Sequence, residues 1–179
     1  MRYNVEDIED QIIATLTGFL SNTQIRTHAG EITATFLDPS LMEGVVNLLP
    51  FVFVQYHGKR ATSRDSMGVI YIHQLTFRLY VGARSLRSKK EAQRSAYGML
   101  RTIYDALHGR VPNIQGLAGQ FVPNTPQGAL NTGPGGSITT AGFNAQTPIF
   151  EAGGQDELLV YNLPTIAIYQ TDYTITLIA

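Results

Sequence analysis

Residues 69–81 read VIYIHQLTFRLYV, and this segment decides the fold class. Its odd-numbered positions, from Val69 to Val81, carry large side chains, and all of these except His73 are aliphatic or aromatic. Alternation with a period of two is typical of a strand that buries one face. We therefore predict a long strand here, in which His73 is a structural histidine within the buried face.

Further strands are expected on both sides of this segment. Residues 51–54 read FVFV, a continuous apolar run suited to a buried strand, and residues 25–27 form a possible short strand. Residues 58–67 are polar and basic, so we expect a loop between the two main strands. Strand chemistry returns at residues 158–161 and 167–178. The apolar side of the last strand consists of Tyr169, Tyr173, Ile175 and Leu177.

Three helices are predicted. The first spans about residues 5–20, with Asn4 as its cap. The second begins at Asp38-Pro39 and ends at Pro50. The third spans about residues 88–108 and is stopped by Gly109. The apolar stripe of the first helix consists of Ile8, Ile12, Leu16, Phe19 and Leu20. The apolar face of the third consists of Ala92, Ala96, Met99, Leu100, Ile103, Tyr104 and Leu107.

The order of these elements predicts an α+β fold. We expect a mainly antiparallel sheet with two or three helices on one face. The 179 residues are enough for one domain with a real core. Residues 1–179 are therefore predicted to form a single domain, with residues 111–150 as an arm or insertion within it.

Residues 111–150 lack any Asp, Glu, Lys, Arg or His and contain seven of the 17 glycines and five of the eight prolines. This composition excludes a regular helix. Apolar side chains recur along the segment, Phe121 and Phe143 among them. Disordered linkers usually stay soluble through charge and lack such anchors. The segment is either an arm that becomes ordered against another surface or a glycine-rich loop without a role.

Charge is distributed unevenly although the net charge is −1. Residues 1–43 contain seven acids and two bases, and residues 84–110 contain seven bases and two acids. Such a layout favours head-to-tail association if the segments form separate surfaces, and has no effect if they mix in the fold.

Catalytic and ligand-binding patterns are not found. The chain has no cysteine, and His28, His57, His73 and His108 lack metal-ligand spacing. Residues 133–137 are glycine-rich but lack the lysine of a phosphate loop. We expect neither an enzyme nor a metal or cofactor site. No apolar run is long enough for a membrane span, and the acidic N-terminus is unlike a signal peptide, so we expect no membrane partner.

A basic cluster lies at the end of the long strand and the start of the third helix, next to three bases of the preceding loop. Its members are Arg84, Arg87, Lys89, Lys90 and Arg94, with Lys59, Arg60 and Arg64 beside them. Phosphate contact is available to such a cluster, but no recognition helix or stacking motif accompanies it. Pairing with an acidic neighbour or passing contact with DNA is the better interpretation.

The sequence resembles the Mu-like phage family of small tail proteins, which are regarded as tail terminators. The resemblance covers about residues 5–110 and, more loosely, the final strand. It rests on Ile8-Glu9-Asp10 with Ile12 and Leu16, on residues 49–56 (LPFVFVQY), on residues 77–81 leading into 83–87 (ARSLR), and on residues 96–100 (AYGML) leading to 106–109 (ALHG). Residues 111–150 are longer and richer in glycine than we expect of this family.

The resemblance implies a ring, a hexamer, that caps the last ring of the tail tube and meets the head-completion or connector proteins. It would lie in the tail or neck of the virion after assembly in the host cytoplasm. No catalytic residues are implied. Candidate interface residues are Glu6, Asp7, Glu9, Asp10, Lys59, Arg60, Arg84, Arg87, Lys89, Lys90, Phe121 and Phe143.

Two other interpretations stay open. The chain is another virion structural protein, such as a tail-tube subunit or a head–tail connector, or it is an enzyme or nucleic-acid-binding regulator. A terminator stops at one closed ring, whereas a tube subunit polymerises.

Overall fold

The computed structural model describes residues 4–27, 44–45, 47–64, 71–110, 150–158 and 165–178. These residues contain two long helices and five strands. The helices are α1 (Val5–Phe19) and α4 (Lys89–Leu107). The strands are β1 (Gln24–Thr27), β2 (Phe51–Arg64), β3 (Tyr71–Arg84), β4 (Glu151–Leu158) and β5 (Ile166–Ile178).

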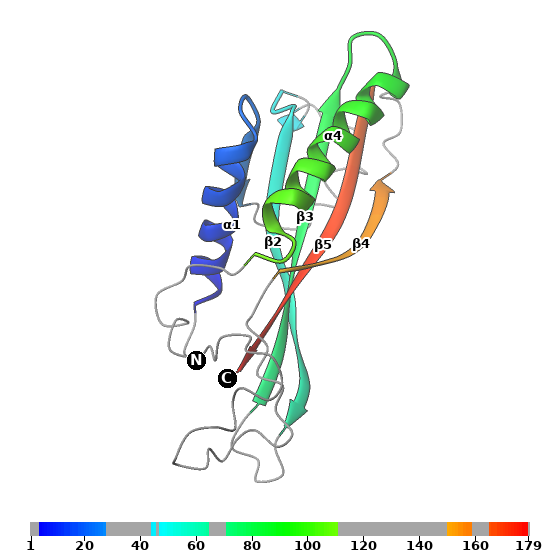
Figure 1. The fold of residues 1–179 in the computed structure, drawn as a ribbon. Helices are drawn as coiled ribbons and strands as arrows, with labels where there is room; N and C mark the ends of the chain where they lie inside the picture. Colours follow the sequence, from blue (N-terminus) through cyan, green and yellow to red (C-terminus); the bar gives the residue numbers. More distant parts are fainter. Residues whose placement is uncertain are drawn as a thin grey trace.

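The strands form one sheet in the order β1-β2-β3-β5-β4. Only β1 and β2 are parallel, and the other neighbouring pairs are antiparallel. Both helices lie on one face of the sheet, and the long strands extend beyond them (Figure 1). The predicted α+β class with a mainly antiparallel sheet is therefore confirmed.

β3 is the central strand, as its alternating sequence predicts. It pairs with β2 from Tyr71 to Gly82 and with β5 from Ile72 to Arg84. Its odd-numbered side chains face the helices, and Leu75, Phe77, Leu79 and Val81 are fully buried there. Period-two alternation places each of these residues opposite an apolar neighbour on the same face of the sheet.

The helices follow the predicted bounds closely. In α1 the Asn4 side chain accepts a hydrogen bond from the Glu6 N–H at 3.2 Å, and Gly109, in the left-handed region at φ 75°, follows the C-cap of α4. Two side chains depart from prediction. Phe19 is 55% exposed and Tyr104 is 46% exposed, because each lies at the rim of its apolar stripe.

The sheet buries apolar side chains on both faces. The larger core lies between the helices and the sheet and includes Ile12, Val54, Ile103 and Tyr173. A smaller cluster, which includes Val45, lies on the helix-free face, defined as the face that carries neither α1 nor α4. There the Phe51 and Phe53 rings stack with centroids 4.2 Å apart. The Arg26 guanidinium lies 5.0 Å from the centroid of the Phe53 ring. The continuous run at residues 51–54 is thus explained, because its side chains are buried alternately on the two faces.

The predicted loop at residues 58–67 is wrong for residues 58–64, which belong to β2. Pairing with β3 keeps this polar segment extended, with register irregularities between Tyr56 and Gly58 and between Ala61 and Ser63. A two-residue β-bulge absorbs an extra residue without ending a strand. Polar composition was therefore a poor guide here, since β3 supplies the hydrogen bonds.

The strand predicted at residues 158–161 begins earlier than expected. β4 occupies Glu151–Leu158, and residues 159–161 lie outside the described residues. Its sequence, EAGGQDEL, contains two glycines and three acids, and it is an edge strand that is mostly exposed. Of the predicted helix at residues 38–49, Gly44 and Val45 are helical, residues 47–48 form a turn, and most of the remainder lies outside the described residues.

Gly82 is predicted to be irreplaceable for packing on the helix-free face. A Cβ atom on Gly82 would lie 2.7 Å from Leu49 Cδ2 and closer still to the Phe51 ring. Gly82→Ala should therefore lower the free energy of unfolding by about 1–3 kcal/mol, measured by urea denaturation. Gly98→Ala is the matched control, because open space surrounds Gly98 on α4, and should raise it by roughly 0.5–1 kcal/mol. Equal effects would contradict the close approach of Phe51 to Gly82.

Candidate assembly surfaces

The basic corner, defined as Arg84, Arg87, Lys89, Lys90 and Arg94, lies where β3 leads into α4. All five residues are exposed. Leu86, between the first two arginines, is 91% exposed. The sequence analysis did not single out Leu86, although an apolar residue in a charged turn was a usable signal. Leu86 thus adds an exposed apolar side chain to the basic corner, between Arg84 and Arg87 in the sequence.

Two serines and one glutamate hold the turn that presents the basic corner. The Glu91 N–H donates to Ser88 Oγ at 3.3 Å, which caps α4, and the Ser85 hydroxyl donates to Glu91 Oε2 at 2.8 Å. The Ser85 N–H also donates to the Thr165 carbonyl at 2.9 Å. Glu91 places a negative charge in the first turn, where it offsets the effect of the bases on the helix dipole. Hydrogen bonds therefore give the turn at the basic corner a defined conformation.

Members of the basic corner differ in their partners. Lys89 Nζ lies 3.4 Å from Glu157 Oε1, so it links α4 to the edge strand β4. Arg87 lies 3.9 Å from Glu91, but its side chain is 85% exposed, and such a pair contributes little. Arg87 thus remains accessible to a partner.

The acidic residues of α1 lie at its N-terminal end. Glu6, Asp7 and Asp10 are exposed there. Asn4 Nδ2 lies 3.5 Å from Asp7 Oδ1, at the limit of a hydrogen bond. This group is a solvated acidic surface next to the positive end of the helix dipole.

The basic corner and the acidic end of α1 lie toward opposite ends of the helix layer. α1 leads through a short turn to Gln24, which pairs with Phe51, and Phe51 pairs with Gly82 near the end of β3. The C-terminal end of α1 and the N-terminal end of α4 are therefore at the same end of the sheet (Figure 1). A helix of 15 residues is about 22 Å long, so the acidic end is well separated from the corner. Among the described residues, the exposed acids of α1 and the basic corner therefore lie on separate surfaces.

Glu9 has a different position from the other acids of α1. It is half-buried, and its Oε1 accepts a hydrogen bond from the Tyr56 N–H at 2.6 Å. Burial raises the pKa of Glu9, although the hydrogen bond from Tyr56 opposes this shift. Glu9 thus ties α1 to β2.

The remaining predicted interface residues lie elsewhere. Lys59 and Arg60 are exposed on β2 rather than in a loop next to the corner. Phe121 and Phe143 lie outside the described residues, as does the predicted arm apart from Phe150.

Phe150 is part of the core, and its backbone joins the two ends of the uncharged segment. The Gly109 N–H donates to the Phe150 carbonyl at 2.8 Å, and the Phe150 N–H donates to the Arg110 carbonyl at 3.0 Å. The Ala152 N–H donates to His108 Nδ1 at 3.2 Å, and the His108 ring stacks on Tyr104. The Phe150 ring is buried 6.5 Å from the Phe77 ring. Residues 111–149 therefore start and end at one point of the fold.

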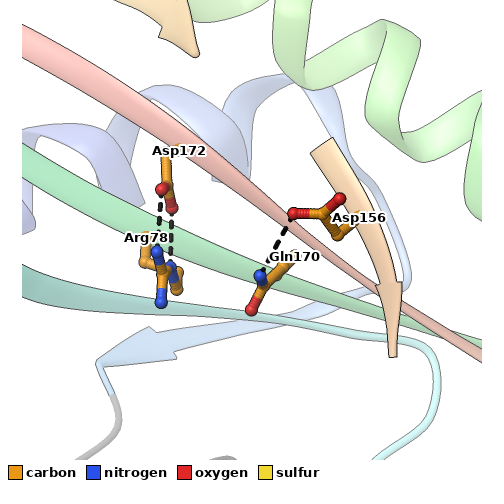
Figure 2. A network of polar contacts seen from close by, with 4 residues as sticks. All are labelled: Arg78, Asp156, Gln170 and Asp172. Atoms are coloured by element: carbon orange, nitrogen blue, oxygen red, sulfur yellow. Dashed lines mark hydrogen bonds and ion pairs between the residues drawn. The ribbon is translucent and has the colours of Figure 1, made fainter. Parts of the chain in front are cut away.

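The helix-free face carries a polar network beside its apolar cluster. Arg78 of β3 donates two hydrogen bonds to Asp172 of β5, at 2.7 and 2.9 Å, and Gln170 contacts Asp156 of β4 at 3.5 Å (Figure 2). The Asp172 carboxylate raises the pKa of Arg78. A bidentate pair of this kind has a defined geometry and fixes the register between neighbouring strands.

Catalytic geometry is not found in the described part of the chain. No group of three or more His, Asp or Glu side chains is placed to hold a metal ion among the described residues. In the same residues no helix is long and apolar enough to cross a membrane.

The family described as Bacteriophage Mu, Gp37 matches residues 4–120, which is more than half of the chain. The chain belongs to this family. No curated protein matches the sequence. The matched residues include α1, the basic corner and the whole of α4. Family membership confirms the resemblance to Mu-like phage proteins and makes this a bacteriophage protein.

We expect Glu9→Gln to stabilise the protein near neutral pH. The raised pKa means that the folded protein binds the Glu9 proton more tightly than the unfolded chain, so the charged form costs stability above the folded-state pKa. This cost disappears as the pH falls below the unfolded-state pKa of about 4.3. The gain of Glu9→Gln, which keeps a carbonyl acceptor for Tyr56, should therefore vanish below about pH 4. Urea denaturation at several pH values measures this.

Two further variants control the Glu9 experiment. Glu9→Ala removes the acceptor of the Tyr56 N–H and should lower the free energy of unfolding by about 1–3 kcal/mol. Asp10→Asn, on the exposed side of α1, should change it by less than about 0.5 kcal/mol. A Glu9→Gln effect that grows as the pH falls would contradict the raised pKa.

Removing residues 116–146 should leave the core folded. Residues 111–115 and 147–149 then connect Arg110 to Phe150, whose backbones are already hydrogen-bonded. Loop length affects stability weakly, so cooperative urea unfolding should persist. As a control, Phe150→Ala in the full chain should cost about 3–5 kcal/mol. Loss of cooperative unfolding on shortening would show that the removed residues belong to the core.

Proposed function

We propose that the protein is a phage tail terminator. Its subunits form a closed ring, a hexamer, which caps the last ring of the tail tube and presents a surface to the head-completion or connector proteins. The protein acts as a structural component of the virion tail or neck and not as an enzyme. DNA passing through the ring would make only transient contact with it.

The separation of opposite charges along one subunit carries this proposal. In a member of a bacteriophage family, the exposed acids of α1 and the basic corner lie toward opposite ends of the helix layer. Two surfaces of opposite sign on one molecule favour heterologous contacts, which close into rings or continue as filaments. Leu86, exposed among the bases, supplies an apolar anchor for such a contact.

The same observation allows a second candidate, a tail-tube subunit. Charged surfaces at opposite ends of a subunit also suit rings that stack on one another. The two candidates differ in what stops assembly, because a terminator forms a single ring and a tube subunit polymerises.

Electron microscopy of particles made by the phage without a functional copy of this protein separates the two candidates. Loss of a terminator leaves tube growth without a stop, so we expect tubes of variable length that are not joined to heads. Complete absence of tubes would overturn the terminator proposal in favour of the tube subunit. Normal tails joined to heads would overturn both.

Reversal of the basic corner by Arg84→Glu, Arg87→Glu and Lys90→Glu should impair attachment much more than folding. Exposed charges contribute at most about 1 kcal/mol each to stability, whereas like charges across an interface cost several kcal/mol. We expect infectious titre to fall at least tenfold in complementation, since about 1.4 kcal/mol corresponds to a factor of ten. Tail length is measured in the same particles.

Arg101→Glu is the control for this reversal, because Arg101 is exposed on α4 outside the basic corner. It should leave titre and tail length unchanged. Normal titre and tail length with the triple variant would remove the basic corner from the attachment surface.

A further inference from the structure

In the described part of the chain, the sheet has two edges without a full-length strand beside them. β4 forms one edge. At the other edge β1 pairs with β2 only opposite residues 51–54 in the described part of the chain. The Tyr56 N–H is satisfied by Glu9. On the side that faces away from β3, residues 57–64 of β2 therefore have no described strand beside them. This open segment is eight residues long, the same length as β4.

The two edges carry opposite charges. β4 contains three acids, Glu151, Asp156 and Glu157, and no base. Residues 57–64 of β2 contain three bases, Lys59, Arg60 and Arg64, and no acid. Charged edges often protect a sheet from pairing with another copy. Like charges on one edge oppose pairing of that edge with the same edge of another copy, whereas opposite signs on the two edges attract one copy to the next.

The charges also match face by face. Arg60 lies opposite Gln74, and Asp156 lies opposite Gln170, so both belong to the helix-free face that carries the Arg78–Asp172 pair. Figure 2 shows Asp156 there, beside Gln170. Lys59 lies opposite Leu75, and Glu157 lies opposite Tyr169, so both belong to the face that carries the helices.

We propose that β4 of one copy pairs with residues 57–64 of β2 in the next copy, so that the ring is closed by a continuous intersubunit sheet. This inference rests on the proposed ring. β4 runs antiparallel to β5, which runs antiparallel to β3, and β3 runs antiparallel to β2. Pairing in a cyclic ring is therefore antiparallel. The register that sets Lys59 opposite Glu157 also sets Arg60 opposite Asp156, and each pair shares a face.

The heights of the two edges agree with a closed ring. Positions along the strand direction can be compared on β3. The register through β5 places β4 beside residues 76–82 of β3, whereas residues 57–64 of β2 lie beside residues 71–76. Closing a sheet around an axis requires tilted strands and a stagger of this kind. Because of this stagger, β4 of the next copy would not overlap β1, which occupies only the part of the edge next to residues 51–54.

Disulfide trapping tests the register, because the natural chain has no cysteine. The test protein is the full chain with Arg60→Cys and Asp156→Cys, incorporated into phage tails. Within one subunit the two sites are three strand spacings apart across the sheet, roughly 14 Å, and six residue positions apart along the strands, roughly 20 Å. A disulfide requires Cα atoms within about 7 Å, so any disulfide must join two copies. We expect oxidised tails to yield a ladder of covalent oligomers that ends at the ring.

Two variants control the trapping experiment. Arg60→Cys with Gln155→Cys moves one site to the neighbouring residue, which lies opposite Thr171 on the other face, and should give no ladder. Each single cysteine should give dimers at most. The edge pairing would be overturned if the variant with Arg60→Cys and Asp156→Cys gave only monomers in tails of normal length that contain the protein. The terminator proposal would then still stand.

A charge swap provides the second test. Arg60→Asp or Asp156→Arg alone places like charges opposite each other and should lower incorporation into tails by at least about tenfold. The double variant Arg60→Asp, Asp156→Arg restores opposite charges and should recover incorporation. Thermal unfolding of the purified chains checks that all three fold. Failure of the double variant to recover, with all chains folded, would overturn the register. Absence of the unmodified protein from tails would instead overturn the terminator proposal on which the inference depends.

Discussion

Pairing of β3 on both sides is the constraint on which the rest of this structure depends. β2 and β5 flank β3, and the alternate side chains of β3 from Leu75 to Ala83 are buried under the helices. A one-residue slip in either ladder would move the buried set to the opposite face. Arg78 and Asp172 hold β3 and β5 in register on the helix-free face, where Gly82 leaves room for the Phe51 ring.

This sheet decides where the charges lie. The chain reversal between α1 and β1 and the turn from β3 into α4 bring the end of one helix and the start of the other to the same end of the sheet. The acids of α1 therefore lie far from the basic corner. In the same way, the strand order places acidic β4 and the basic half of β2 at opposite edges. A subunit that is nearly neutral overall thus has opposite charges at its two ends and at its two edges.

Phe150 shows how the fold accommodates the uncharged segment. Its ring is buried against the core, and its backbone is hydrogen-bonded to Gly109 and Arg110. The two ends of the segment are held together whatever its length, because the hydrogen bonds join its last residue, Phe150, to Gly109 and Arg110, which precede it. The family match also ends within this segment, at residue 120, so the matched part of the chain contains α1 to α4.

The sequence by itself determined the fold class, the bounds of α1 and α4, and the central strand. These features depend on local periodicity and capping, as in the alternation of residues 69–81 and the stop at Gly109. Only the tertiary structure decided that residues 58–64 are strand and that β4 begins at Glu151, because the hydrogen bonds of polar edge segments come from neighbouring strands. The tertiary structure also decided that Glu9, Lys89 and Leu86 differ from their neighbours in contacts or exposure. Their residue types alone would not distinguish them from other surface residues. Glu9 and Lys89 depend on contacts with Tyr56 and Glu157, which are distant in the sequence, and the turn that exposes Leu86 is also tied to distant Thr165.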